Sequence, residues 1–312
     1  MTRRFLFLAS CIAIAACGNP GLEPGEGFVD VTGGRVWYRI SGSGTATPLI
    51  LLHGGPGFPS YYLKPLEALA DERPVIIYDQ LGAGRSERPT DPTLWTVSRW
   101  VAELGQVREA LGLDEVHILG HSWGTMLAVE YMLGDPQGVQ SLTLASPGLS
   151  SSRWFEDARR LLRTMPDSIQ DVIQEHEEAG TFDSPEYQKA VGAYFGRYFA
   201  RRLPLTADMD SSLAERNIDI YLQAWGPSEF NPTGFLRTFE RAEALSEFDL
   251  PILFTAGRYD SAVPETVEYY ASLARDARVV ILENSAHMTM QDEPERSVEV
   301  VRQFLRGVDS RR

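Results

Sequence analysis

Cysteine is almost absent from this chain, and its positively charged residues are outnumbered. The two cysteines, Cys11 and Cys17, lie close to the start, so the rest of the chain has neither a disulfide nor a cysteine nucleophile. Lysine and arginine number 29 against 43 acidic residues, which gives a formal net charge of −14 at pH 7. Nucleic acid and anionic lipid surfaces repel such a chain. Charge therefore excludes nucleic acid as a partner, and it excludes a membrane unless a lipid anchor holds the protein there.

The start of the chain has the composition of an export signal. Residues 1–16 begin with basic residues and continue as an apolar run that is too short to span a membrane comfortably. Ile14-Ala15-Ala16-Cys17 resembles the bacterial lipoprotein signal, in which the cysteine is acylated. An ordinary secretory signal, or a twin-arginine signal containing Arg3-Arg4, is the alternative. We predict a signal peptide over 1–16, lipidation of Cys17, a flexible tether over 17–27, and a place on the periplasmic side of the bacterial cell envelope. Without acylation, the protein would be secreted or periplasmic.

Apolar segments alternate with helical segments over residues 28–148 and again over 227–312. Residues 48–52 and 75–78 are continuous apolar runs, which are typical of strands buried on both faces of a parallel sheet. This alternation predicts an α/β fold with a mostly parallel, doubly wound sheet. The expected elements are a hairpin over 28–40, strands over 48–52, 75–78, 115–120, 140–144, 250–256 and 278–282, and helices over 97–111, 263–273 and 298–305.

The alternation stops between residues 149 and 226. Ser184-Pro185 is typical of a helix N-terminus, and Tyr187, Val191 and Tyr194 follow at helical spacing. We predict a helical cap over 149–226, inserted where it would cover the strand ends at which ligands bind. Its aromatic side chains are interpreted as helix-packing core, with a substrate pocket as the alternative.

A Gly-x-Ser-x-Gly pattern joins an apolar strand to a helix at Gly120-His121-Ser122-Trp123-Gly124. This is the pattern of a nucleophile elbow, in which the serine sits on a strained turn. Chain segments pass close to such a turn, and glycine leaves room for them because it has no Cβ. We therefore predict that Ser122 is a nucleophile, although a glycine-flanked turn is the simpler alternative.

A serine nucleophile needs a base, and the chain has five histidines. His176 is interpreted as a solvated residue, His117 as a packing residue and His53 as a loop-bracing residue. His121 is set aside because the serine side chain of the elbow is aimed away from it. His287 follows the last strand, at the edge of the sheet where the elbow also lies, so it is the predicted base. Asp260 lies between Ser122 and His287 in the chain and gives the order serine, acid, histidine of α/β-hydrolases. Asp79 and Glu283 are the competing acids.

The developing oxyanion needs aligned backbone donors, and losing one costs about 3–4 kcal/mol of transition-state stabilisation. The amide of Trp123, which follows the nucleophile, is one predicted donor. The second is predicted in the loop His53-Gly54-Gly55-Pro56-Gly57, at Gly55. Local packing is the alternative function of both residues.

Four motifs together resemble those of the proline iminopeptidases. They are the loop over 53–57, Asp79-Gln80-Leu81-Gly82-Ala83-Gly84-Arg85-Ser86, the elbow over 120–124, and Gly257-Arg258-Tyr259-Asp260. The likeness extends over nearly everything after the tether, and it is greatest to the branch typified by the tricorn-interacting aminopeptidase. It implies the α/β-hydrolase fold with a helical cap, no metal and no cofactor. It also implies release of an N-terminal residue, often proline, from short peptides through an acyl-enzyme.

The resemblance also implies a site for the free amine of the substrate. Gly226-Pro227-Ser228-Glu229-Phe230 is similar to the family segment that supplies an amine-binding carboxylate, so Glu229 is the expected residue. A cation in a dry pocket needs a paired anion to offset its desolvation. In the relatives a second glutamate follows the triad aspartate, whereas this chain has Ser261. That charge is therefore missing or supplied elsewhere. An amino-acid amidase, an esterase or a lactonase with the same triad, or a non-catalytic binding protein, are the alternatives.

Overall fold

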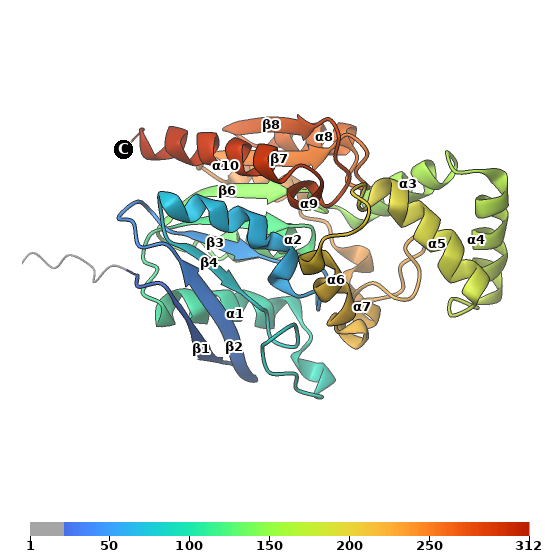
Figure 1. Cartoon of the computed structure of the whole chain (residues 1–312), viewed down its shortest axis with the longest axis horizontal. Coiled ribbons are helices and arrows are strands. Elements are labelled where there is room, and N and C mark those ends of the chain that lie inside the picture. The colour runs from blue at the N-terminus through green and yellow to red at the C-terminus, as the bar shows by residue number, and fades with distance from the viewer. Residues whose placement is uncertain (1–21, 312) are drawn as a thin grey trace, which may run out of the picture.

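A computed structural model of the chain describes residues 22–311. The described residues form an eight-stranded sheet in the order β1-β2-β4-β3-β5-β6-β7-β8 (Figure 1). β2 pairs antiparallel with β1 and β4, and every other neighbouring pair is parallel. The strands are β1 Gly25–Val31, β2 Gly34–Ser41, β3 Leu49–Leu52, β4 Val75–Tyr78, β5 Val116–His121, β6 Val139–Ala145, β7 Ile252–Gly257 and β8 Ala277–Leu282. The predicted α/β fold with a mostly parallel sheet is confirmed.

Helices cover both faces of the sheet because successive side chains of its central strands point to opposite faces. Ile50 and Leu52 pack in one cluster with α1 (Val97–Ala110), α2 (Trp123–Met132) and α8 (Pro264–Leu273). Leu49 and Leu51 pack in the other cluster with the 3₁₀ segment η1 (Ser60–Asp71) and α10 (Pro294–Asp309). All four residues of β3 are fully buried, which explains the continuous apolar run of that strand.

The first strand begins earlier than the sequence indicates. Strand β1 starts at Gly25 rather than Phe28, so the expected tether over 17–27 is shortened by the pairing of Gly25 with Ile40. Glu26 explains why this glycine-rich stretch is ordered, because its carboxylate accepts hydrogen bonds from Arg39 Nε at 2.8 Å and Trp37 Nε1 at 3.3 Å.

Five helices lie between β6 and β7, namely α3 Ser151–Leu162, α4 Asp167–Ala179, α5 Pro185–Tyr198, α6 Ala207–Ala214 and α7 Ile218–Ala224. Figure 1 shows α3, α4 and α5 projecting beyond the body that holds the sheet, with α6 and α7 nearer to it. The 3₁₀ segments η3 (Phe235–Thr238) and η4 (Ala242–Glu247) then lead back to β7.

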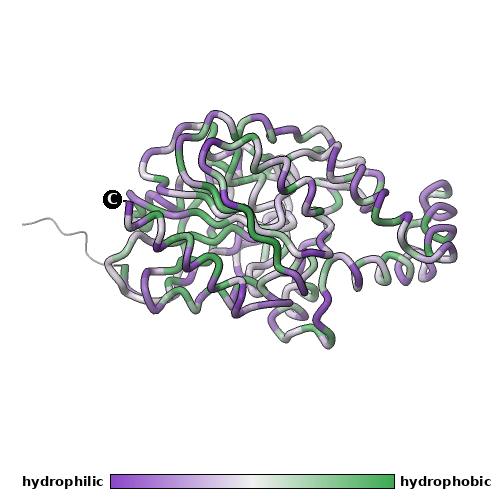
Figure 2. Tube along the Cα trace, turned by 90° about the horizontal axis from the view of Figure 1, so that it is seen from above, coloured by the Kyte–Doolittle hydropathy of each residue, from purple (hydrophilic) through white to green (hydrophobic). Residues whose placement is uncertain are grey.

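The projecting helices have a small core of their own. The aromatic residues of α5 pack there with residues of α3 and α4, among them Tyr187, Tyr194, Tyr198, Ala158 and Ile173. In Figure 2 this projecting part alternates polar and apolar residues, whereas continuous apolar stretches run through the body. Packing is therefore one function of the aromatic residues of α5.

The predicted signal peptide and Cys17 lie outside the described residues. Within residues 22–311, no helix is both long enough and apolar enough to cross a bilayer. Two short elements complete the described chain, the 3₁₀ turn η2 (Pro92–Leu94) and the helix α9 (Thr289–Asp292).

Candidate active site

Ser122 lies on a strained turn between β5 and α2. Its φ of 54° and ψ of −120° fall outside the regions that side-chain-bearing residues favour. A Cβ on Gly120 would lie 2.2 Å from the carbonyl oxygen of Gly124, and a Cβ on Gly124 would lie 2.2 Å from that of Leu52. The strand and the helix therefore approach each other only because both positions are glycine. This geometry is that of a nucleophile elbow.

His287 and Asp260 are brought together from the loops that follow β8 and β7. His287 Nδ1 lies 2.8 Å from Asp260 Oδ1, and both side chains are buried. The same oxygen accepts a hydrogen bond from the amide of Ala262 at 2.8 Å, which fixes the carboxylate. Because the carboxylate accepts, the ring carries its proton on Nδ1 and leaves Nε2 free to act as a base.

The loop of His287 is held against the elbow by two hydrogen bonds to its carbonyl oxygen. One comes from His121 Nε2 at 2.9 Å and the other from Ser146 Oγ at 3.0 Å. The rings of His121 and His287 also lie with their centroids 4.9 Å apart. Since His121 immediately precedes Ser122, these contacts place the His287–Asp260 pair beside the serine.

The competing acids are engaged elsewhere. Glu283 is exposed and pairs with Arg258 at 2.6 Å. Asp79 accepts hydrogen bonds from the amides of Ser60 at 2.8 Å and Arg85 at 2.9 Å, so it orders the loop after β4. Neither carboxylate bonds to His287.

Two backbone amides near the elbow are free to bind an oxyanion. Among residues 22–311, the amides of Gly55 and Trp123 have no hydrogen-bond acceptor. Gly55 has a φ of 111°, and a Cβ there would lie 2.7 Å from the amide nitrogen of Phe58. The carbonyl of Gly54 belongs to the same peptide group as the Gly55 amide and lies 2.8 Å from His53 Nδ1, which fixes the orientation of that group.

Glu229 lies in the same site. The Tyr221 hydroxyl donates a hydrogen bond to Glu229 Oε1 at 2.7 Å. Burial raises the pKa of Glu229, and its hydrogen bond with Tyr221 and the charge of His287 oppose this shift. Ser261, which stands where the resemblance implies a second glutamate, is buried, and its amide donates to the carbonyl of Tyr198 at 3.2 Å.

Comparisons with known proteins agree with this geometry. The sequence model of a family described as the alpha/beta hydrolase fold matches residues 47–294. The proline iminopeptidase of Heyndrickxia coagulans is 48% identical over 286 residues, which cover 91% of this chain and 99% of the relative. The proline iminopeptidase of Clostridium botulinum is 35% identical over 289 residues, with the same coverage.

The chain belongs to the proline iminopeptidase family of α/β-hydrolases. Among solved structures, the Mycobacterium smegmatis proline iminopeptidase superposes with a TM-score of 0.85 at 32% identity, covering 91% of this chain and 99% of that one. VinJ superposes with a TM-score of 0.87 at 33% identity, covering 92% and 100%. The resemblance drawn from the sequence motifs is confirmed.

In this member of the family, a buried network that sequence reasoning missed joins the elbow to the glycine loop. The amide of Gly54 donates to the Tyr62 hydroxyl at 2.8 Å, and this hydroxyl lies 2.8 Å from His121 Nδ1. Burial, assisted by the charge of His287, lowers the pKa of His121 to about 3. The ring is therefore neutral at pH 7. It accepts from Tyr62 through Nδ1 and donates to the His287 carbonyl through Nε2.

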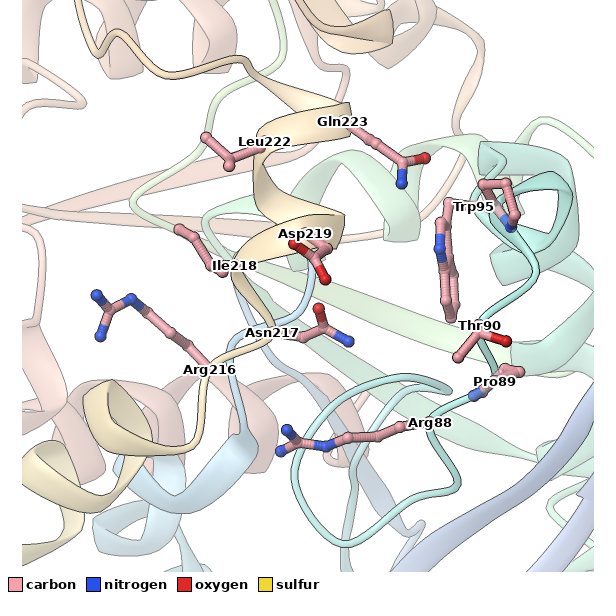
Figure 3. A pocket seen from close by; sticks show the side chains of 11 residues that line it. Arg88, Pro89, Thr90, Trp95, Arg216, Asn217, Ile218, Asp219, Leu222 and Gln223 are labelled. Atoms are coloured by element: carbon pink, nitrogen blue, oxygen red, sulfur yellow. The ribbon is translucent and has the colours of Figure 1, made fainter. Parts of the chain in front are cut away.

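A hollow of about 810 Å³ is lined by residues of the segment before α1 and by residues of α7 and the turn that precedes it (Figure 3). Asp219 and Gln223 lie on the side of α7 toward Trp95, whereas Ile218 and Leu222 extend from the other side of the helix. None of the candidate catalytic residues lines it. Within residues 22–311, no group of three or more His, Cys, Asp or Glu side chains is arranged to hold a metal ion.

Proposed function

We propose that this chain is a serine aminopeptidase that releases the N-terminal residue, with proline favoured, from short peptides. The observation that carries the proposal is the buried His287–Asp260 pair beside the Ser122 elbow, with the carboxylate of Glu229 in the same site. Membership of the proline iminopeptidase family supports the same substrate class.

The reaction begins when Ser122 Oγ attacks the carbonyl carbon of the N-terminal residue. His287 Nε2 takes the hydroxyl proton, and Asp260 stabilises the resulting imidazolium. The amides of Gly55 and Trp123 donate hydrogen bonds to the oxyanion. When the tetrahedral intermediate collapses, the C–N bond breaks and His287 gives its proton to the departing amine.

The acyl-enzyme is then hydrolysed by the same groups. His287 takes a proton from water, the hydroxide attacks the ester carbon, and the bond to Ser122 Oγ breaks as the oxygen regains a proton from His287. The free amino acid and the shortened peptide leave, and the enzyme returns to its starting state.

Glu229 gives the site its preference for a free N-terminus. A substrate ammonium that enters this half-buried space loses its hydration, and a carboxylate repays that cost through a charge-assisted hydrogen bond. Tyr221 holds one carboxylate oxygen, so the carboxylate is oriented before the substrate binds. An N-acetylated substrate offers no charge for Glu229 to pair with.

Three substrates test this function: a prolyl anilide, its N-acetylated form and a simple neutral ester. We expect efficient cleavage of the free-amine anilide and a loss of at least about tenfold in kcat/KM when the amine is blocked. Ser122→Ala should abolish turnover of the anilide. Equal rates on the free and acetylated anilides would contradict the aminopeptidase proposal and favour the esterase, lactonase or amidase alternatives.

We also propose that the protein is exported and anchored by acylation of Cys17. The basic start, the short apolar run and the Ala-Ala-Cys sequence support this location. Metabolic labelling with a fatty acid, followed by fractionation of the envelope, should show label in the wild-type chain and none in Cys17→Ser. Retention of the full leader in the mature protein, measured by mass spectrometry, would contradict this proposal.

A further inference from the structure

A second carboxylate lies beside the amine-binding residue and belongs to the cap. Glu177, on α4, accepts hydrogen bonds at Oε1 from Ser228 Oγ at 2.5 Å and from the Tyr187 hydroxyl at 2.6 Å. Ser228 immediately precedes Glu229, so its bond to Glu177 connects the two acidic positions. The negative charge of Glu177 adds to burial in raising the pKa of Glu229. The hydrogen bond between Ser228 and Glu177 therefore places the two acidic residues next to each other in the cap.

Each carboxylate is held by hydroxyl groups that bond to one of its two oxygens. Hydroxyl groups occupy Oε1 of each, with Tyr221 on Glu229 and Ser228 and Tyr187 on Glu177. Among residues 22–311, no protein group donates to the Oε2 atom of either residue. Two half-buried anions held side by side with no cation repel each other, which costs energy unless a positive charge enters.

A buried hydroxyl without a partner points to a missing ligand at the same place. Tyr194, on α5, is only 2% exposed, and its hydroxyl has no hydrogen-bond partner within the described part of the chain. The Tyr194 ring packs against that of Phe230, the residue after Glu229, with ring centroids 5.0 Å apart. The hydroxyl therefore belongs to the surroundings of Glu229, whose charge adds to burial in raising the pKa of this hydroxyl. Buried hydroxyls are nearly always paired, and a substrate group bound here would supply the partner.

We propose that Glu177, Glu229 and the Tyr194 hydroxyl together bind the substrate ammonium. Glu177 then supplies the second negative charge that is absent at Ser261. This inference rests on the proposed aminopeptidase function and deepens it. The secondary ammonium of an N-terminal proline has two N–H groups, one for each carboxylate. A primary ammonium has a third N–H, which the oxygen of Tyr194 accepts.

Glu177→Gln tests the second charge while keeping an oxygen for Ser228 and Tyr187. We expect its KM for a prolyl anilide to rise at least about tenfold, and the rate at which a neutral fluorophosphonate labels Ser122 to stay unchanged. Glu178→Gln is the matched control, because it removes the same charge from the next, exposed position of α4. It should leave both quantities as they are in the wild type.

Tyr194→Phe tests the third contact without removing any existing hydrogen bond. Its KM should rise severalfold more for an alanyl anilide than for a prolyl anilide, because only the primary ammonium uses the third acceptor. Pyrrolidinium serves as a probe for the carboxylates alone. It should inhibit the wild type and Tyr194→Phe competitively with similar constants, and Glu177→Gln at least about tenfold more weakly.

The outcomes separate this inference from the proposed function. If Glu177→Gln keeps the wild-type KM and pyrrolidinium inhibition, Glu177 only ties α4 to the segment of Ser228 and the inference is wrong, although the aminopeptidase proposal stands. If the wild type itself cleaves free and acetylated anilides equally well, the proposed function fails and the inference fails with it. If Tyr194→Phe changed KM equally for the two anilides, Tyr194 would not be part of the ammonium-binding site.

Discussion

At the scale of single residues, Asp260 has the most specific task, since it sets the tautomer of His287. Its carboxylate accepts at Oδ1 from the ring at 2.8 Å and from the Ala262 amide at 2.8 Å. Its Oδ2 accepts from the amide of Gly257 at 3.3 Å. The side-chain amide of Asp260→Asn has one oxygen and one donor nitrogen, so it cannot replace both acceptors and favours the wrong tautomer of His287. We expect kcat for a prolyl anilide to fall by about 10³–10⁴. Glu283→Gln, which disturbs only an exposed pair with Arg258, should leave kcat unchanged. A loss below about tenfold in Asp260→Asn would mean that another acid orients His287.

At Glu229, the proposed role in substrate binding opposes the stability of the fold. Burial raises its pKa above that of an exposed glutamate, so the folded chain binds a proton more tightly than the unfolded chain does. The resulting cost to stability is present above the folded-state pKa and disappears as the pH falls through it. We expect Glu229→Gln to raise Tm at pH 8 and to have less effect at acidic pH, while kcat/KM for a prolyl anilide falls by about ten- to a hundredfold. Thermal unfolding at several pH values measures the first effect. A lower Tm at pH 8 would contradict the argument.

At the scale of secondary-structure elements, glycines divide into those that the packing requires and those that it tolerates. A Cβ on Gly124, the second residue of α2, would lie 2.2 Å from the carbonyl oxygen of Leu52 in β3. Gly192 lies inside α5, and a Cβ there has nothing within 4 Å. We expect Gly124→Ala to destabilise the fold and to disable the elbow. Gly192→Ala should stabilise the fold by about 0.5–1 kcal/mol, because alanine has the higher helix propensity. Chemical denaturation of the two variants checks both signs, and similar changes in the two would contradict the packing argument.

Tyr62 connects three elements through one hydroxyl. It accepts from Gly54 in the glycine loop and contacts His121 at the end of β5, and His121 bonds to the loop after β8. Tyr62→Phe leaves a buried amide without an acceptor, which costs about 1–3 kcal/mol of stability. It also removes the hydrogen bond that holds the loop over 53–57, in which Gly55 lies. We expect kcat to fall by about tenfold or more with little change in KM, because oxyanion binding is needed only in the transition state. A change in KM alone would show that Tyr62 acts on substrate binding instead.

At the scale of the whole molecule, the sequence predicts what local patterns determine. Parallel strands that are buried on both faces have continuous apolar sequences, so they can be recognised locally. The order of the strands then places Ser122, Asp260 and His287 in loops at the same edge of the sheet. Contacts between segments that lie far apart in the chain have no such local pattern. Glu177 looks like one more acid in an exposed helix until Ser228 is placed against it. The early start of β1 is hidden in the same way, because Glu26 orders a glycine-rich stretch only through Arg39 and Trp37.

The net charge of −14 acts on the molecule as a whole and favours a cationic substrate. A negative field attracts the ammonium of a peptide before any contact forms, and salt screens this attraction over about 10 Å at 0.1 M ionic strength. We expect kcat/KM for a prolyl anilide to fall severalfold as sodium chloride is raised from about 0.01 M to about 0.5 M. The rate at which a neutral fluorophosphonate labels Ser122 carries no such term and should change little. If both rates fell together, salt would be acting on the fold or the triad, and the electrostatic explanation would be wrong.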